Sequence, residues 1–525
     1  MKFYVLILEK LRTNFLLLFF FLLSGTDFFS QPNTQTSNPF SRYGIGEIEN
    51  KGFAQLSAMG RSFSAYENDE RDSINPVFIN VANPASLSSL KLTVFETGAK
   101  SDFNFLRSNS NSTFKNNTYL NYLSLAFPIN RKTGVAAGIS PFSNVGYEIL
   151  DSNEVSNVGK VKTLYQGNGG LSQVFLGMGY RPFQQKASRF LRSKQYDSLR
   201  KTQQWETIRQ KLFWSNLLSS FSIGANAYYL FGDLNNTTSV IYPSNTSYFN
   251  VRRVRNTRVS DFYFSYGALI SIRIDSTYKR RACIQSNGRG QEYIEFKKDC
   301  PCKDSLNAEN YETLFPKRFR KRSEWKITLG ATAYLPSALR ADYTAAAYTY
   351  KTFSPTLDLV YDTTLNISKT GSLNIPLLMS FGMGIRKGTK LTILADMSIQ
   401  NWSYYRFFDE NPGLKNSVRY SLGFQYVKNG DVKRVREMLR QKTMIRGGAF
   451  YNAGYLDLKN TPITEYGISF GFGFPLGRWV WNHANISAEL GKMGTTQNNL
   501  IQTNFARLTI GLTLNQKWFV KRVID

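Results

Sequence analysis

The sequence is poor in the residues that build metal, redox and acid–base sites. Among its 525 residues there are one histidine, His483, and three cysteines. A single imidazole excludes a histidine-rich metal site, and it leaves no second histidine for a proton relay. Three thiols cannot supply the four thiolates of an ordinary iron–sulfur cluster. We therefore expect no cofactor and no metal.

Charge and long apolar runs are also scarce. Charged residues make up 19% of the chain, and the mean hydropathy of −0.32 excludes a bundle of transmembrane helices. After the first 30 residues, no segment approaches the roughly 18 apolar residues of a membrane-spanning helix. Aromatic residues nevertheless reach 15%. A polar average with abundant aromatics is typical of a membrane β-barrel, because its inward face is wet.

Residues 1–30 are expected to be a signal peptide. Lys2, Lys10 and Arg12 supply positive charge around the apolar run Phe15–Leu23, and Ser30 precedes a plausible cleavage point. This run is too short to span roughly 30 Å of hydrocarbon as a helix. The alternative is an N-terminal anchor that is not cleaved. We expect export and a place in the outer membrane of a Gram-negative cell.

From residue 91 onward, apolar side chains recur at every second position. The last segment alternates Leu508, Ile510, Leu512 and Leu514 with Arg507, Thr509, Gly511 and Thr513. Successive side chains of a strand point to opposite faces, so one face is apolar and the other is small or polar. Fourteen segments show this pattern: 91–106, 117–129, 134–150, 171–182, 219–234, 259–275, 323–350, 372–387, 389–405, 417–429, 444–458, 463–477, 482–496 and 503–519.

The fold class predicted from these segments is all-β, an antiparallel transmembrane β-barrel of about 14 strands over residues 91–519. An even number of strands lets both ends lie on one side, and closure removes the unpaired edges that hydrocarbon does not tolerate. The alternative is a large soluble all-β protein. Residues 31–90 precede the barrel, and residues 520–525 form a C-terminal tail.

The connections between these segments fall into two kinds. Tight turns at 131–134, 387–390 and 477–478 suit the periplasmic side, and long linkers rich in Asn, Ser and Thr at 151–170, 235–258 and 351–371 suit outer loops. Two basic insertions, 184–214 and 276–322, and a short basic helix at 431–442 interrupt the periplasmic side. They could meet lipid head groups or a periplasmic protein. The alternative is a solvated loop with surplus lysine.

The cysteines and the histidine give no catalytic site. In an oxidising compartment Cys283 could pair with Cys300 or Cys302, which leaves one thiol over. His483 is expected to open the thirteenth strand at a turn, far from the outer leaflet where a barrel phospholipase finds its substrate. The sequence therefore predicts a protein that is not an enzyme. The basic charge of +28 is spread over turns of an exported chain, which argues against nucleic acid as a partner.

Residues 31–90 do not alternate, and their motifs resemble a known family. They contain Ala58-Met59-Gly60-Arg61 and end on Asn83-Pro84-Ala85-Ser86-Leu87, immediately before the first strand. This resembles the N-terminal hatch of the FadL family, outer-membrane channels for fatty acids and other hydrophobic compounds. In that family an Asn-Pro-Ala-x-Leu motif precedes a barrel of fourteen strands. The opening and the end of the chain also look like barrel proteins of Bacteroidetes-type bacteria, a group that includes the PorV-like barrels.

The resemblance implies that the hatch plugs the lumen and that a kink in the third strand opens a lateral window. In the third segment Pro141 lies between Gly138 and Phe142. Proline cannot donate to a strand ladder, so it must interrupt pairing locally. The interruption could open the wall, or it could be a bulge that only bends the strand. Four aromatics near outer strand ends could bind a ligand or could form an interfacial girdle: Phe142, Phe231, Tyr348 and Phe407.

Two functions are expected from these features. The first is passive uptake of hydrophobic, fatty-acid-like small molecules by lateral diffusion into the membrane, driven by burial of apolar surface. The second is a barrel that does not transport and serves as an interaction or assembly component, such as a type 9 secretion accessory protein. Pro141 and the hatch favour uptake, whereas the basic insertions favour a protein partner.

Overall fold

The computed structural model describes residues 35–68, 77–183, 205–243, 247–278, 281–286, 292–297, 321–354, 357–428, 443–476 and 482–516. Several expectations lie outside these residues: the signal peptide, positions 184–204 and 298–320 of the basic insertions, the helix at 431–442, Cys300 and Cys302, and the C-terminal tail. No helix in the described part of the chain is long and apolar enough to cross a membrane.

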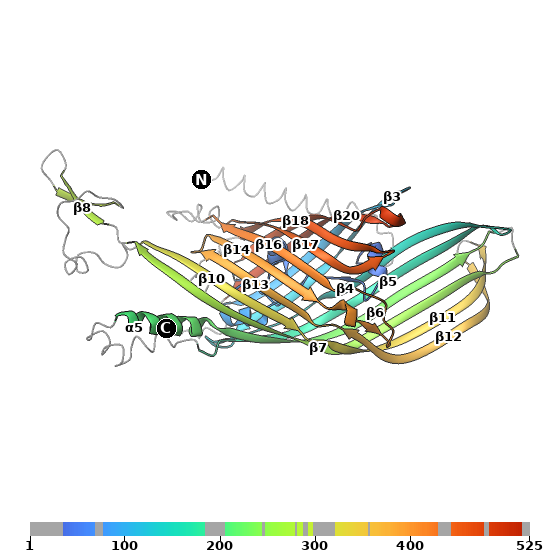
Figure 1. Cartoon of the computed structure of the whole chain (residues 1–525), viewed down its shortest axis with the longest axis horizontal. Helices are drawn as coiled ribbons and strands as arrows, with labels where there is room; N and C mark the ends of the chain where they lie inside the picture. The colour runs from blue at the N-terminus through green and yellow to red at the C-terminus, as the bar shows by residue number, and fades with distance from the viewer. Residues whose placement is uncertain are drawn as a thin grey trace, which may run out of the picture. The chain divides into compact units, whose positions relative to one another are not determined.

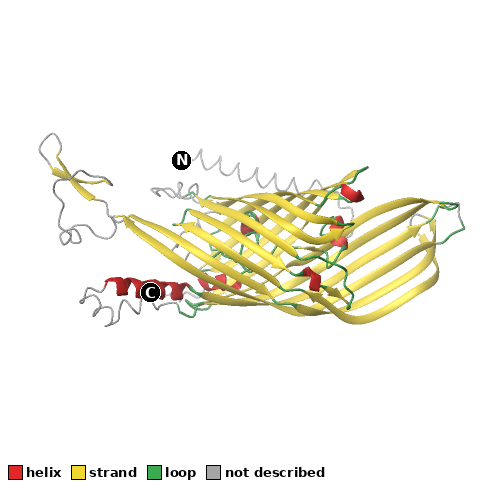
Figure 2. Cartoon of the chain, in the orientation of Figure 1, coloured by secondary structure: helices red, strands yellow, loops and turns green. Residues whose placement is uncertain are grey.

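Sixteen labelled strands form the barrel wall, and they occupy fourteen positions (Figures 1 and 2). They are β2 (Thr93–Arg107), β3 (Ser112–Pro128), β4 (Thr133–Val155), β5 (Gly159–Tyr180), β6 (Ser222–Ile241), β7 (Asn250–Tyr278), β10 (Lys321–Tyr334), β11 (Ser337–Ser354), β12 (Leu357–Ile375), β13 (Leu378–Lys387), β14 (Leu391–Gln400), β16 (Ser417–Val427), β17 (Met444–Leu458), β18 (Thr461–Pro475), β19 (His483–Met493) and β20 (Gln502–Gln516).

Two wall positions are each broken by a proline. β10 and β11 both pair with β7, so they are one position interrupted at Pro336. β12 and β13 pair with β11 and β10 respectively, and Pro376 separates them. Closure comes from β2 and β20, which pair from Thr93↔Gln516 to Arg107↔Gln502. The predicted fold, a closed antiparallel barrel of 14 strands, is confirmed.

The wall is apolar outside and polar inside. On β20, Ile510 and Leu512 are more than 40% exposed, whereas Thr509 and Thr513 are buried. The same order, large apolar side chains outward and polar side chains inward, recurs on β18 and β19. A soluble protein would reverse it, because apolar surface leaves water on folding. The arrangement is that of a barrel in the outer membrane.

The three long linkers are not loops, which corrects the expectation for 151–170, 235–258 and 351–371. β4 and β5 continue to a turn at 156–158, β6 and β7 pair up to Val240↔Val251, and β11 and β12 pair up to Ser354↔Leu357. Six strands therefore extend the wall beyond the others as one sheet, at the right of Figure 1. Asn, Ser and Thr are common in loops, but here continuous pairing with Val, Tyr and Arg on neighbouring strands holds them in strands.

The remaining elements are short. Ahead of the barrel lie η1 (Pro39–Arg42), β1 (Glu47–Ile48), α2 (Ala54–Ser57) and η2 (Pro84–Ser89), and later come η4 (Trp402–Tyr404), β15 (Arg406–Phe407) and η5 (Gln497–Asn499). Helix α5 (Trp205–Ser220) includes the last residues of the first basic insertion. In the second insertion β8 (Arg281–Ser286), which contains Cys283, pairs with β9 (Glu292–Lys297) in a separate sheet.

Residues 35–68 and 77–92, called the lumenal segment from here on, lie inside the barrel. From Gly52 to Asn68 every residue is buried. The segment bonds to strands all around the wall: Gln55 to Glu96 on β2, Phe63 to Asp396 on β14, and Gly60 to Ser469 on β18. Glycines on the inner wall make room for it. A Cβ at Gly330 would collide with the carbonyl of Ser64.

Candidate functional site

The wall changes at Pro141, on β4. β3 and β4 pair from Pro128↔Gly134 to Leu123↔Ile139 and then part, two residues before Pro141. β4 stays paired with β5, with a register shift between Pro141 and Ser143. Among the described residues, no strand of the wall pairs with β3 on this edge from Ser112 to Tyr122. We call this stretch the β3–β4 separation.

The lumenal segment occupies the edge that β3 leaves. Glu47 and Ile48 of β1 pair with Asn144 and Ser143 of β4. The amide of Glu49 donates to the carbonyl of Phe142 at 3.0 Å. The side chain of Phe142 is buried and packs edge-on against Tyr263, with ring centroids 5.7 Å apart. Gly138 lies in the last paired stretch, so all three predicted positions meet where the two strands part.

Glu49 spans the β3–β4 separation with its carboxylate. Oε1 accepts from Tyr119 of β3 at 2.5 Å and from Asn144 of β4 at 2.7 Å. Oε2 lies 2.8 Å from Nζ of Lys100 on β2. Burial alone would raise the pKa of Glu49, but the charge and hydrogen bond of Lys100 outweigh it and lower the pKa to about 2. One side chain thus ties three wall strands to the segment.

The predicted Asn-Pro-Ala-x-Leu motif forms the end of the lumenal segment. Asn83 caps η2, because its Oδ1 accepts from the amide of Ala85 at 3.2 Å and Pro84 takes the first position. Its Nδ2 donates to the carbonyl of Ser64. Leu87 is buried, and Gly134 of β4 lies against its carbonyl. The motif therefore fastens the segment to the wall.

A network of buried ion pairs ties the lumenal segment to the wall further along. Arg61 lies 2.6 Å from Glu489 and 3.3 Å from Glu465. Arg507 lies 3.0 Å from Glu465 and 2.7 Å from Glu47. Arg61 of the lumenal segment, Glu465 of β18, Glu489 of β19 and Arg507 of β20 therefore form one network of ion pairs, and Glu47 of β1 is its fifth member. Sequence reasoning missed this network, although Glu465, Glu489 and Arg507 lie at inward positions of their strands.

A second cluster holds the segment on the opposite side. Glu67 lies 2.6 Å from Arg181 and 2.7 Å from Lys326 of β10. Burial raises the pKa of Glu67, but the two neighbouring cations outweigh burial and lower the pKa to about 2. Glu67 is thus charged at any physiological pH.

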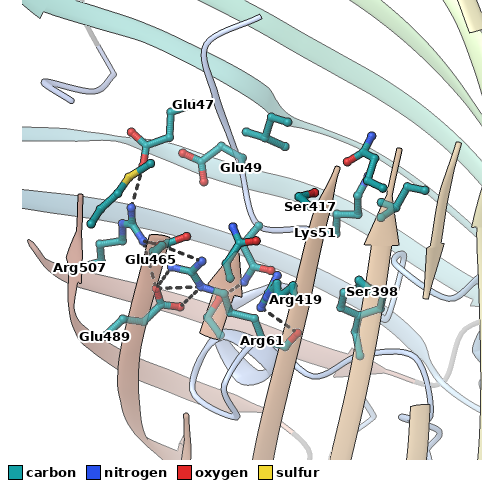
Figure 3. A pocket seen from close by; sticks show the side chains of 18 of the residues that line it. Glu47, Glu49, Lys51, Arg61, Ser398, Ser417, Arg419, Glu465, Glu489 and Arg507 are labelled. Carbon is teal, nitrogen blue, oxygen red and sulfur yellow. Dashed lines mark hydrogen bonds and ion pairs between the residues drawn. The ribbon is translucent and has the colours of Figure 1, made fainter. Parts of the chain in front are cut away.

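A cavity lies among these charges. It measures about 170 Å³, and Figure 3 shows its polar lining. Four glutamates and five basic side chains face it: Glu47, Glu49, Glu465, Glu489, Lys51, Arg61, Lys100, Arg419 and Arg507. Two further cavities, of about 20 and 30 Å³, lie near Tyr263 and Tyr334. Each holds about one water molecule.

Comparison with known proteins identifies the family. The BamG family matches residues 12–187 and 303–525, well over half of the chain. The chain belongs to the BamG family. No curated protein matches it.

Solved structures with a similar course of the chain match at low identity. The toluene transporter TbuX of Ralstonia pickettii is 9% identical with a TM-score of 0.48, covering 89% of this chain and 99% of its own. The toluene transporter TodX of P. putida is 12% identical with a TM-score of 0.48, at 90% and 99%. A Pseudomonas aeruginosa FadL homologue is 9% identical with a TM-score of 0.47, at 90% and 100%.

The other predicted residues of this BamG-family protein do not converge. The four aromatics contact different partners: Phe142 meets Tyr263, Phe231 meets Tyr229, Tyr348 meets Tyr350, and Phe407 meets Phe408 and Tyr343. His483 is buried at the first residue of β19. No group of three or more His, Cys, Asp and Glu in the described residues could hold a metal ion. The pairing of Cys283 stays a prediction.

Proposed function

We propose that this BamG-family protein is an interaction component of the outer membrane, a barrel that closes its own lumen and binds another protein through its sheet extension. The observation that carries the proposal is the buried ion-pair network that locks the lumenal segment in place. Breaking a buried ion pair by removing one partner costs about 3–5 kcal/mol. Withdrawing the segment would separate the pairs of Glu49, Arg61 and Glu67 together, so the lumen is a poor path for a solute.

The sheet extension supports the second half of the proposal. Beyond Gly146, β4 pairs only with β5, and from Leu357 to Gly371 β12 pairs only with β11. Both strands thus present backbone donors and acceptors without a strand partner among the described residues. Such an edge is a template for pairing with another chain. Near the tip of β12, Val360 and Tyr361 are each 57% exposed.

Site-specific cross-linking tests this role. Ser368 on the edge strand β12 lies directly opposite Thr344 on the inner strand β11, and both are exposed. A photo-reactive phenylalanine at Ser368 should cross-link to a protein in the native membrane, and the same probe at Thr344 should not. Equal cross-linking at both positions, or none at Ser368, would contradict the proposal.

Uptake of hydrophobic molecules is the second candidate, favoured by the β3–β4 separation beside Pro141. Its ligand would be a fatty-acid-like compound that leaves sideways into the membrane. Under this function the side chain of Glu49 blocks the lateral exit at the β3–β4 separation. Glu49→Ala should therefore increase uptake of labelled oleate by whole cells. The exposed pair Arg258–Asp233 provides a control, since Arg258→Ala leaves the separation intact. Equal uptake with and without the protein would exclude this function.

A further inference from the structure

The charges around the 170 Å³ cavity do not all have partners. Three of its five basic side chains face carboxylates: Arg61 with Glu489, Lys100 with Glu49, and Arg507 with Glu47 and Glu465. These pairs use all four glutamates of the lining. Neither Lys51 nor Arg419 has a carboxylate within 4 Å among the described residues. Two cations thus remain in the lining without a carboxylate in contact, although Glu465, Glu489 and Asp396 attract Arg419 from farther away.

The contacts of Arg419 leave part of its guanidinium open. Nη2 lies 3.3 Å from the carbonyl oxygen of Gly60 and 3.4 Å from that of Arg61. The buried Nε has no hydrogen-bond partner. An unpaired buried donor costs about 1–3 kcal/mol, and more when the group is charged. Arg419 therefore has both charge and a donor available for a ligand.

The buried positive charge of Lys51 is stabilised by contacts with aromatic rings alone. Its Nζ lies 3.5 Å from the ring centroid of Tyr334 and 5.8 Å from that of Phe142. A desolvated cation–π contact is worth about 2 kcal/mol, less than the several kcal/mol that burial of an ammonium costs. Burial accordingly lowers the pKa of Lys51 to about 7. A counter-ion at this position would relieve the cost.

The polar neighbours of the two cations suit an oxyanion. Ser398 and Ser417 also line the cavity, and hydroxyls donate to an anion as readily as amides do. Figure 3 shows Lys51, Ser417, Ser398 and Arg419 in the part of the view away from Glu489 and Arg507. Among the described residues, this part of the lining carries donors and unpaired positive charge, whereas the other part carries the paired carboxylates.

We propose that the lumenal cavity binds a small oxyanion, a carboxylate or a phosphate, between Lys51 and Arg419, with Ser417 as a further donor. The cavity volume of about 170 Å³ accepts a phosphate or a short carboxylate. The site is independent of the protein-binding role, because neither cation belongs to the sheet extension. The anion is either a free ion or the head of an amphiphile that reaches Lys51 past Pro141, which lines the adjoining small cavity together with Lys51.

Anion binding to the full chain in detergent tests the site. Inorganic phosphate, acetate and octanoate are titrated at constant ionic strength, with thermal unfolding and calorimetric Kd as readouts. At least one of them should raise Tm, and Lys51→Met should weaken binding at least about tenfold, because one charged partner of a buried contact is lost. Lys51→Arg should retain binding, and Lys390→Met, at an exposed turn lysine, should behave as the parent protein.

The arms of the titration separate the two sources. If acetate and phosphate bind as tightly as octanoate, the ligand is a free ion. If octanoate binds much more tightly than the other two, the ligand is the head of an amphiphile. Either result supports the site. No response to any of the three anions, or an equal response in Lys51→Met, overturns the proposal. Should Lys51→Met fail to fold, a crystal of the parent protein with selenate decides: an anomalous peak between Lys51 and Arg419 is expected, and a cavity without a peak refutes the site.

Discussion

Replacing Glu49 by alanine should loosen the lumenal segment at the β3–β4 separation. The substitution leaves Nζ of Lys100 without its nearest carboxylate, at 2.8 Å, and removes the nearer acceptor of Tyr119 and the acceptor of Asn144. Loss of one partner of a buried ion pair costs about 3–5 kcal/mol. Lys100 keeps Asp102 at 3.6 Å, so we expect the lower end, about 3 kcal/mol.

Hydrogen exchange measured by mass spectrometry reports this loss of stability segment by segment. A drop of about 3 kcal/mol in the free energy of local opening corresponds to exchange faster by about 100-fold. We expect it in residues 40–57 and not in the sheet extension. Glu49→Gln keeps an acceptor for Tyr119 and loses the charge, so its exchange should lie between that of Glu49→Ala and that of the parent chain.

An exposed ion pair gives the matched control. Arg258 and Asp233 lie 2.9 Å apart, but their side chains are 68% and 39% exposed, and such pairs contribute at most about 1 kcal/mol. Arg258→Ala should therefore change exchange less than about tenfold. The reasoning is refuted if Glu49→Ala exchanges at the rate of the parent chain, or if exchange rises equally throughout the barrel.

Other positions give further expectations. Arg61→Ala should lower Tm and raise the permeability of proteoliposomes to small polar solutes, because it leaves Glu489 and Glu465 short of positive charge. The stability of the parent chain should rise with pH between about 7 and 10.5, because the unfolded chain holds the proton of Lys51 more tightly. Lys51→Met should flatten that rise in a Tm-versus-pH series. Asn83→Ala should cost about 1–2 kcal/mol through the lost cap, measured by denaturant titration. Gly330→Val should expose the lumenal segment to protease, because a Cβ there meets the carbonyl of Ser64.

Most of the wall could be predicted from the sequence because alternation of side chains is a local property. The pattern around Leu508–Leu514 needs only neighbouring residues, and the structure places those apolar side chains outward. Segment 323–350 was predicted as one strand because its alternation continues on both sides of Pro336, where the structure separates β10 from β11. The alternation pattern also failed to predict the sheet extension. There, pairing with the neighbouring strand, rather than amino-acid composition, keeps residues such as Asn366 in a strand.

The interior was less accessible from the sequence. The Asn83–Leu87 motif and the position of Pro141 could be picked out, since a cap and a missing donor act locally. The partners of Glu49, Arg61 and Lys51 could not, because they come from strands that lie between 51 residues (Lys100 for Glu49) and 428 residues (Glu489 for Arg61) away in the sequence. Charge at an inward position shows that a side chain needs a partner, and only the three-dimensional arrangement shows whether it has one.

The seam between β2 and β20 sets an order of assembly. Arg61 is synthesised early, but Glu465, Glu489 and Arg507 belong to the last three strands. Contacts between such distant parts of a chain form late, because the entropy of closing the intervening loop must first be overcome. The ion pairs of Arg61 therefore form only when β18, β19 and β20 are in place, so completion of the barrel and formation of this network become a single event.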